Sequence, residues 1–124
     1  MNWYTEDLDA RIGKHICEVK MEKYGNQQDV IVVNFGEHGV VTIKDEPCCC
    51  ESRYTSTDDD LPQFSGAIFL GDEVRDAPNV DCEYEEHEVQ FYILKTDRGN
   101  ITFQNHNEHN GYYGGFSLKS QVTP

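Results

Sequence analysis

Residues Val30 to Ile43 read VIVVNFGEHGVVTI, and this stretch decides the fold class. Two runs rich in β-branched residues flank a connection, Gly36 to Gly39, that has glycine at both ends. Such runs favour strands, and a short glycine-containing connection between them is typical of a β-hairpin. The same arrangement returns where VQFYILKTDRGNITF runs from Val89 to Phe103. The sequence therefore predicts two hairpins and a mainly β, antiparallel fold.

The two hairpins stand at similar places in two similar halves of the chain. Gly13-Lys14-His15-Ile16 opens a strand before the first hairpin, and the segment from Gly66 to Val74 opens one before the second. The offset of roughly fifty to sixty residues lies in the range that flags internal repeats. We therefore predict one compact domain, residues 1–124, built from two strand-plus-hairpin halves at roughly 13–54 and 66–118.

Outside these strands, capping residues indicate one or two short helices, between Thr5 and Ile12 and within Thr55 to Phe64. From His15 onward, polar and apolar residues alternate. That alternation predicts a half-buried strand with Cys17, Val19 and Met21 on one side.

The charge of the chain limits its partners. Its 124 residues include 10 basic and 23 acidic ones, a formal net charge of -13, which repels nucleic acids and anionic membrane surfaces. No apolar run approaches the ~20 residues that span a bilayer, and the start of the chain does not read as a signal peptide. We expect a cytoplasmic protein with reduced cysteines and no direct contact with nucleic acid or membrane.

The segment NHNEHNGYYGGF, from Asn105 to Phe116, combines polar side chains, two tyrosines and three glycines. This composition resists regular structure and predicts a recognition loop. Its candidate ligand-binding residues are Asn107, His109, Asn110, Tyr112 and Tyr113, which offer hydrogen bonds and aromatic faces. The alternative is an irregular turn whose tyrosines cover the core.

A second unusual segment, DEPCCCESRY from Asp45 to Tyr54, holds the corresponding position in the other half. Ser52, Arg53 and Tyr54 offer a hydroxyl, a guanidinium that can hold phosphate bidentately, and a face for stacking. If the halves are related by approximate twofold symmetry, the two segments line a shared pocket. The alternative for Arg53 is an internal salt bridge to the Asp58-Asp59-Asp60 cluster.

The cysteines allow two further hypotheses. A zinc site would combine Cys48 and Cys50 with Cys82 and a histidine, and a thiol nucleophile would pair one of Cys48 to Cys50 with His106 or His109. The paired ligand spacing of recognisable zinc sites is absent from the sequence, and simple packing of small thiols is the favoured interpretation. We expect no metal, no cofactor and no catalytic residue.

Three marks of the chain resemble a known family: Gly13-Lys14 at a strand start, Cys49-Cys50 leading into Ser52-Arg53-Tyr54, and the close NGYYGG from Asn110 to Gly115. Across residues 12–119 the sequence is similar to an uncharacterised group of small domains from bacteriophages and bacteria, known as a domain of unknown function. The resemblance implies a phage setting, in which small proteins often oppose host defence.

From the residues and this resemblance together, we expect a phage counter-defence protein. It would bind a nucleotide-derived immune signal of the cyclic ADP-ribose type without turnover, as a homo-oligomer that encloses its pocket between copies. The first alternative is an acidic mimic of nucleic acid that blocks a host defence enzyme, using Asp58 to Asp60 and Glu83 to Glu86. The second alternative is a metal- or thiol-dependent enzyme.

Overall fold

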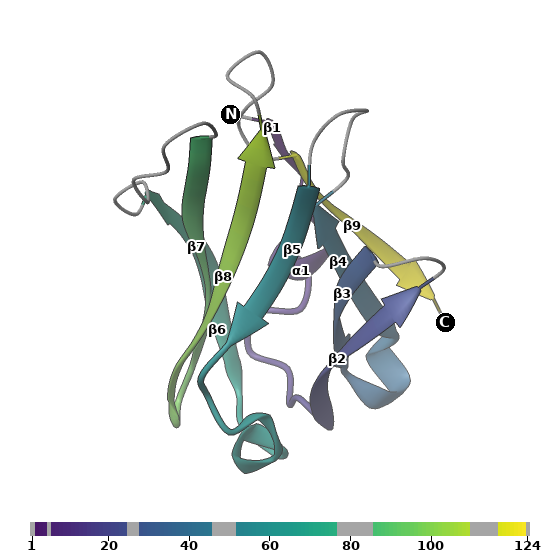
Figure 1. The fold of residues 1–124 in the computed structure, drawn as a ribbon. Coiled ribbons are helices and arrows are strands. Elements are labelled where there is room, and N and C mark those ends of the chain that lie inside the picture. Colours follow the sequence, from purple (N-terminus) through teal and green to yellow (C-terminus); the bar gives the residue numbers. More distant parts are fainter. Residues whose placement is uncertain are drawn as a thin grey trace.

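A computed structural model describes residues 2–4, 6–24, 28–45, 52–76, 86–109 and 117–123. Its strands form two sheets that face each other (Figure 1). The first sheet has the order β1-β9-β4-β3-β2 and the second has the order β5-β8-β7-β6. The strands are β1 (Asn2–Tyr4), β2 (Glu18–Tyr24), β3 (Gln28–Asn34), β4 (Val40–Asp45), β5 (Ser52–Thr57), β6 (Phe69–Asp76), β7 (Glu86–Thr96), β8 (Gly99–His109) and β9 (Ser117–Thr123). The predicted mainly β, compact fold class is confirmed.

Both predicted hairpins are present. β3 and β4 pair antiparallel around a 3-10 turn, η1 (Gly36–His38), and the Phe35 amide donates to the Gly39 carbonyl at 2.9 Å to close the turn. Gly39 adopts a φ of 94°, a backbone conformation that residues other than glycine rarely adopt. β7 and β8 pair along their whole length, ending at Thr96 opposite Gly99. The β-branched runs thus form the central strands of each sheet.

The last strand after each hairpin crosses to the other sheet. β5 follows β4 along the chain but pairs with β8, and β9 follows β8 but pairs with β4. Apart from β1, the two sheets therefore have equivalent orders, β9-β4-β3-β2 and β5-β8-β7-β6. An internally repeated chain that exchanges its fourth strands would have this arrangement. The repeat itself, at roughly 13–54 and 66–118, stays a prediction.

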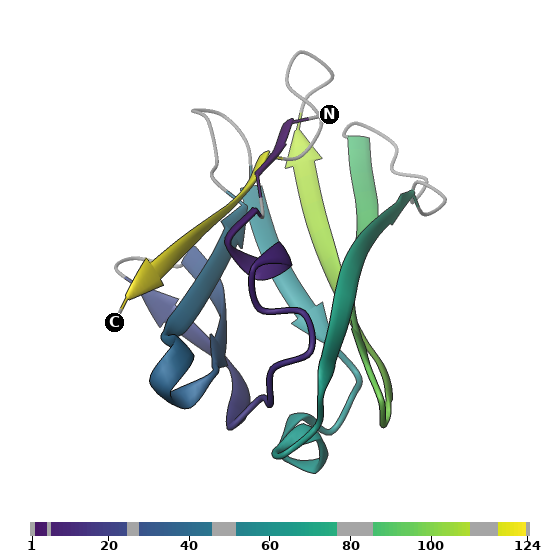
Figure 2. The same cartoon turned by 180° about the vertical axis from the view of Figure 1, so that it is seen from behind.

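The core lies between the sheets and follows the period-two alternation of the strands. On β4 the exposure alternates residue by residue, with Val41 and Ile43 fully buried. The opposing sheet contributes Tyr92, Leu94, Ile101 and Phe103, also fully buried. On one side of the molecule, the segment from α1 (Glu6–Asp9) to β2 runs between the sheets (Figure 2).

This N-terminal segment closes one open side of the sandwich. Leu8 and Ile16 are fully buried in the core. The amide of Gly13 donates to the Phe69 carbonyl, and that of Ile16 donates to the Ala67 carbonyl, each at 2.7 Å. The gap beside β6 is thus filled by the chain itself.

Three details differ from the sequence predictions. The helix expected over 5–12 is a single turn, α1, and the second is the 3-10 helix η2 (Leu61–Phe64). Cys17 is exposed instead of sharing the inner face with Val19, because β2 begins only at Glu18 and the strand alternation does not extend back to Cys17. β1, which pairs parallel with β9, was not expected.

Within the described residues, the structure contains no helix long and apolar enough to cross a membrane.

The buried hydroxyl of Tyr92 should make the free energy of unfolding depend on pH in the alkaline range. Its hydroxyl donates to Asp72 Oδ2 at 2.7 Å, and burial together with the charges of Asp72 and Asp9 raises its pKa well above 10.0. Above pH ~10 the unfolded chain loses this proton while the folded chain keeps it, so the free energy of unfolding falls by about 1.4 kcal/mol per pH unit. Below that pH the phenol contributes no slope.

Urea denaturation at pH 9 and pH 11, on the native protein and on Tyr92→Phe, measures this effect. The phenylalanine variant should lose about 1–2 kcal/mol at neutral pH, because Asp72 loses a donor. It should also lose less stability than the native protein between the two pH values. Equal losses in the two proteins would show that Tyr92 does not carry the alkaline transition.

Candidate functional site

The two sequence segments singled out for binding are anchored at the same end of the molecule. At the end of β4, Asp45 pairs with Leu118 of β9, and near the end of β8, Glu108 pairs with Ser52 of β5. The end of β4, the start of β5, the end of β8 and the start of β9 therefore all lie at one end of the molecule (Figure 1). We call it the crossover end. The strand exchange brings the flanks of the two segments together.

Part of the expected recognition loop is a strand. Asn105 to His109 belong to β8, so for these five residues the prediction that the segment resists regular structure is wrong. In the second segment, Ser52 to Tyr54 belong to β5. β8 lies between β5 and β7 and pairs with both, and these backbone hydrogen bonds outweigh the weak strand preference of asparagine. The candidate side chains on these strands consequently have fixed register positions.

The register divides the candidate residues between two faces of the second sheet. Arg53 pairs with Asn107, whereas Tyr54 pairs with His106. Because successive residues of a strand alternate between faces, positions 53 and 54 belong to opposite faces. Asn107 is fully buried and thus marks position 53 as part of the inner face, between the sheets. A single ligand on one face cannot use both Arg53 and Tyr54 as neighbours.

The inner face of β8 changes from apolar to polar toward the crossover end. Its buried positions are Ile101, Phe103, Asn105 and Asn107, in that order along the strand. Gln90 on β7 pairs with Asn105 and is also buried, with 2% of its surface exposed. Three buried amide side chains therefore gather between the sheets at this end. Buried amides are costly unless hydrogen bonds satisfy them, so they indicate a specific polar arrangement.

Neighbouring strands supply partners to this amide cluster. The Thr55 hydroxyl donates to Asn105 Oδ1 at 2.7 Å, and the Thr55 amide donates to Asp29 Oδ2 at 2.9 Å. The Asn105 Nδ2 atom is buried and has no hydrogen-bond partner among the described residues. Asp45, 7% exposed, adds a carboxylate to the same interior.

The outer face carries a separate aromatic pair. The rings of Tyr54 and His106 stack with centroids 4.4 Å apart and planes inclined by 10°. His106 Nε2 lies 3.1 Å from the Ser56 hydroxyl oxygen. Both rings are only partly buried. This pair presents a flat polar-aromatic surface on the side of the sheet away from Asn107.

Several predicted residues lie outside the described part of the chain, namely Asn110, Tyr112, Tyr113, Cys48, Cys49, Cys50 and Cys82. Of Ser52, Arg53 and His109 the structure gives the backbone position, and His109 is the last residue of β8, opposite Glu86. In the portion that the structure describes, no three acidic, histidine or cysteine side chains gather as a metal site would require.

The acidic cluster proposed as a partner of Arg53 has other roles. Asp59 Oδ2 accepts the Thr102 amide at 2.7 Å, and Asp60 Oδ2 accepts the Gln63 side-chain amide at 3.0 Å. Extended β5 also carries Arg53 away from these carboxylates.

Sequence reasoning missed Gln90, Asn105, Thr55 and Asp29. A signal was present, because Asn105 and Asn107 continue the alternation of Ile101 and Phe103 at positions where apolar residues are expected. Polar residues at inward positions of a strand indicate either a hydrogen-bonded network or a site. Gln90 and Asp29 could be assigned to the same cluster as Asn105 only once the pairing and contacts of their strands were known.

A family model described as Domain of unknown function (DUF7448) matches residues 9–119. No curated protein and no solved structure matches the chain.

Proposed function

This chain belongs to the DUF7448 family of domains of unknown function, and from that premise we propose that it binds and sequesters a nucleotide-derived signalling molecule of the cyclic ADP-ribose type. In this proposal the protein is a phage counter-defence factor that holds the ligand without turnover. The observation that carries it is the pairing of Arg53 with Asn107 at the crossover end, where both motif-bearing segments are anchored.

The chemistry of the inner face suits such a ligand. An arginine can hold a phosphate through two parallel hydrogen bonds, and buried amides can donate to and accept from the edges of a base. Asn105 Nδ2 provides one buried donor at this place. Tyr112 and Tyr113 follow β8 along the chain and would supply the stacking faces. Because position 54 belongs to the other face, Tyr54 and Ser52 have no part in this arrangement.

The buried amide side chains support the proposal of binding without turnover. Asparagine and glutamine amides neither take up nor release protons near neutral pH, so they favour recognition over acid-base catalysis. The net charge of -13 opposes an anionic ligand at long range. A guanidinium and oriented amide donors can still make a local phosphate site inside an acidic protein.

The decisive experiment incubates the purified protein with a panel of cyclic nucleotides and cyclic ADP-ribose isomers, removes free ligand, heats the protein and identifies what is released. We expect one ligand to raise the melting temperature and to be recovered unchanged. Recovery of a cleaved product would show an enzyme. No thermal shift and no recovered ligand across the panel would overturn sequestration.

The dependence of binding on salt concentration distinguishes the acidic-mimic alternative from ligand sequestration. Capture of a basic enzyme by surface charge should weaken steeply between low and high ionic strength, while a hydrogen-bonded pocket should lose little affinity. Asp59 Oδ2 accepts the Thr102 amide, so this one carboxylate of the cluster is less available for mimicry.

A further inference from the structure

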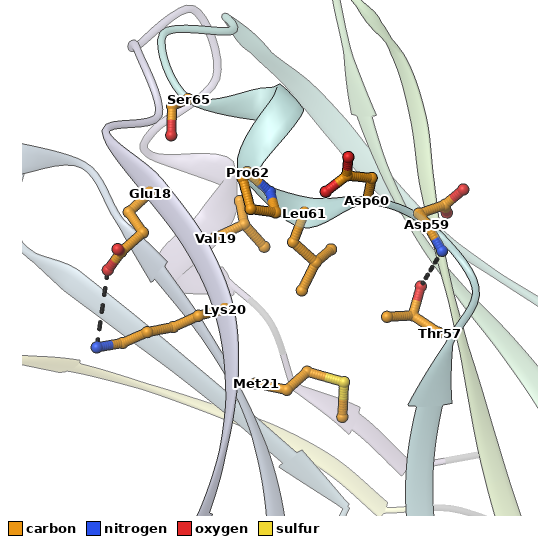
Figure 3. A pocket seen from close by; sticks show the side chains of 10 residues that line it. All are labelled: Glu18, Val19, Lys20, Met21, Thr57, Asp59, Asp60, Leu61, Pro62 and Ser65. Atoms are coloured by element: carbon orange, nitrogen blue, oxygen red, sulfur yellow. Dashed lines mark hydrogen bonds and ion pairs between the residues drawn. The ribbon is translucent and has the colours of Figure 1, made fainter.

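A cavity of about 480 Å³ lies on the side of the sandwich that the N-terminal segment does not close. It is bounded by β2 on one side and by the end of β5 together with η2 on the other (Figure 3). Its volume is within the range of sites that hold ligands or side chains of a partner. The N-terminal segment fills the gap beside β6, and none of its described residues, 6–17, lines this cavity.

The floor of the cavity is apolar. Val19, Met21 and Leu61 point into the open space in Figure 3. Val19 is 2% exposed and belongs to the core, while Met21 and Leu61 are partly buried hydrophobic residues packed against it. An apolar floor that continues the core favours an occupant with an apolar side chain, because each buried methylene contributes about 0.8 kcal/mol.

The wall formed by β2 offers backbone groups. β2 is the last strand of its sheet, and in the described structure it pairs with β3 alone. The outward N–H and C=O groups of such an edge strand are a template for another extended segment. The cavity therefore combines an apolar floor with a strand edge beside it.

The rim of the cavity is acidic. Asp59, Asp60 and Glu18 line it, against one basic residue, Lys20. The Lys20 ammonium is 2.9 Å from Glu22 and 3.7 Å from Glu18, and these carboxylates raise its pKa, so its charge is already compensated. Asp60 is exposed. The rim thus complements positive charge.

From these three properties we propose that the cavity docks an extended segment of a partner protein in which an apolar side chain is flanked by lysine or arginine. The segment pairs with the outer edge of β2, its apolar side chain occupies the floor, and a basic side chain meets Asp60. This site differs from the one at the crossover end. β5 begins at that end with Ser52, and its last residue, Thr57, lines the cavity about 16 Å further along the strand.

The probe for this site is a fluorescent peptide in which lysine alternates with leucine, compared with peptides in which glutamate replaces lysine or serine replaces leucine. We expect only the lysine-leucine peptide to bind. Its addition should shift backbone amide resonances of β2 and of residues 57–62, leaving β6 unchanged. Binding of the glutamate peptide, or shifts confined to other strands, would overturn the proposal.

Matched variants test the rim and the floor separately. Asp60→Lys should weaken peptide binding about tenfold or more, whereas Asp58→Lys, the same charge change at an exposed residue outside the cavity, should have a much smaller effect. Met21→Gln should weaken binding, while Leu70→Gln, at a residue 51% exposed and outside the cavity, should not. Equal effects within either pair would refute the site, and thermal unfolding of each variant verifies folding.

Discussion

Arg53→Met is expected to raise the dissociation constant of the sequestered nucleotide by between about tenfold and about a hundredfold. The magnitude follows from the 1.5–3 kcal/mol that hydrogen bonds to charged groups contribute. Methionine keeps the unbranched stem and removes the guanidinium, so the change isolates the phosphate contact. The measurement is calorimetric titration with whichever ligand the thermal-release panel identifies.

The arginine series needs two comparisons. Arg53→Lys keeps the charge and loses the planar fork, so its affinity should lie between those of the native protein and Arg53→Met. Arg75→Met is the matched control, because Arg75 is exposed on β6, at the opposite edge of the second sheet from β5. If Arg53→Met binds as tightly as Arg75→Met, Arg53 does not hold the phosphate, and the assignment of the inner face must be abandoned.

Phe103→Ala is expected to lower the free energy of unfolding by about 3–5 kcal/mol, the usual cost of truncating a buried phenylalanine. Phe103 is fully buried, pairs with Tyr92 on β7 and with Thr57 on β5, and stands where the inner face of β8 changes from apolar to polar. Domains of this size are stable by about 5–15 kcal/mol, so the variant loses a large part of its stability. Urea denaturation followed by circular dichroism measures the change.

Phe91→Ala provides the control for this truncation. Phe91 lies next to Tyr92 on β7, on the outer face, and is only partly buried. The same chemical change there should cost less than half as much, because water already reaches the ring. Similar losses at both positions would mean that the core is not the space between the two sheets.

The hairpins were predictable because each depends on residues close together in sequence. The runs around Gly36 to Gly39 and around Asp97-Arg98 carry both the strand preference and the turn chemistry, and the structure has strands where the sequence predicted them. Cys17 shows the limit of the same reasoning, because period-two alternation indicates the two faces of a strand but not the residue at which the strand begins.

The candidate site was only partly predictable. Composition drew attention to both segments, and the structure anchors them at one end. The division of Arg53 and Tyr54 between faces requires knowing that Ser52 to Thr57 form a strand, and their polar composition does not indicate one. The cavity beside Met21 and Leu61 unites residues forty apart in sequence and carried no sequence signal.

By itself, the sequence determined the β class, the two hairpins and the chemistry that the two unusual segments can offer, because strand preference, turn formation and charge are local properties. Only the tertiary structure decided which sheet β5 and β9 join. Each edge of each hairpin has unpaired backbone N–H and C=O groups with which another strand can pair. Local sequence patterns therefore do not determine which edge β5 or β9 joins. The choice depends on how two complete sheets bury their inner faces against each other, and it places Arg53 beside Asn107.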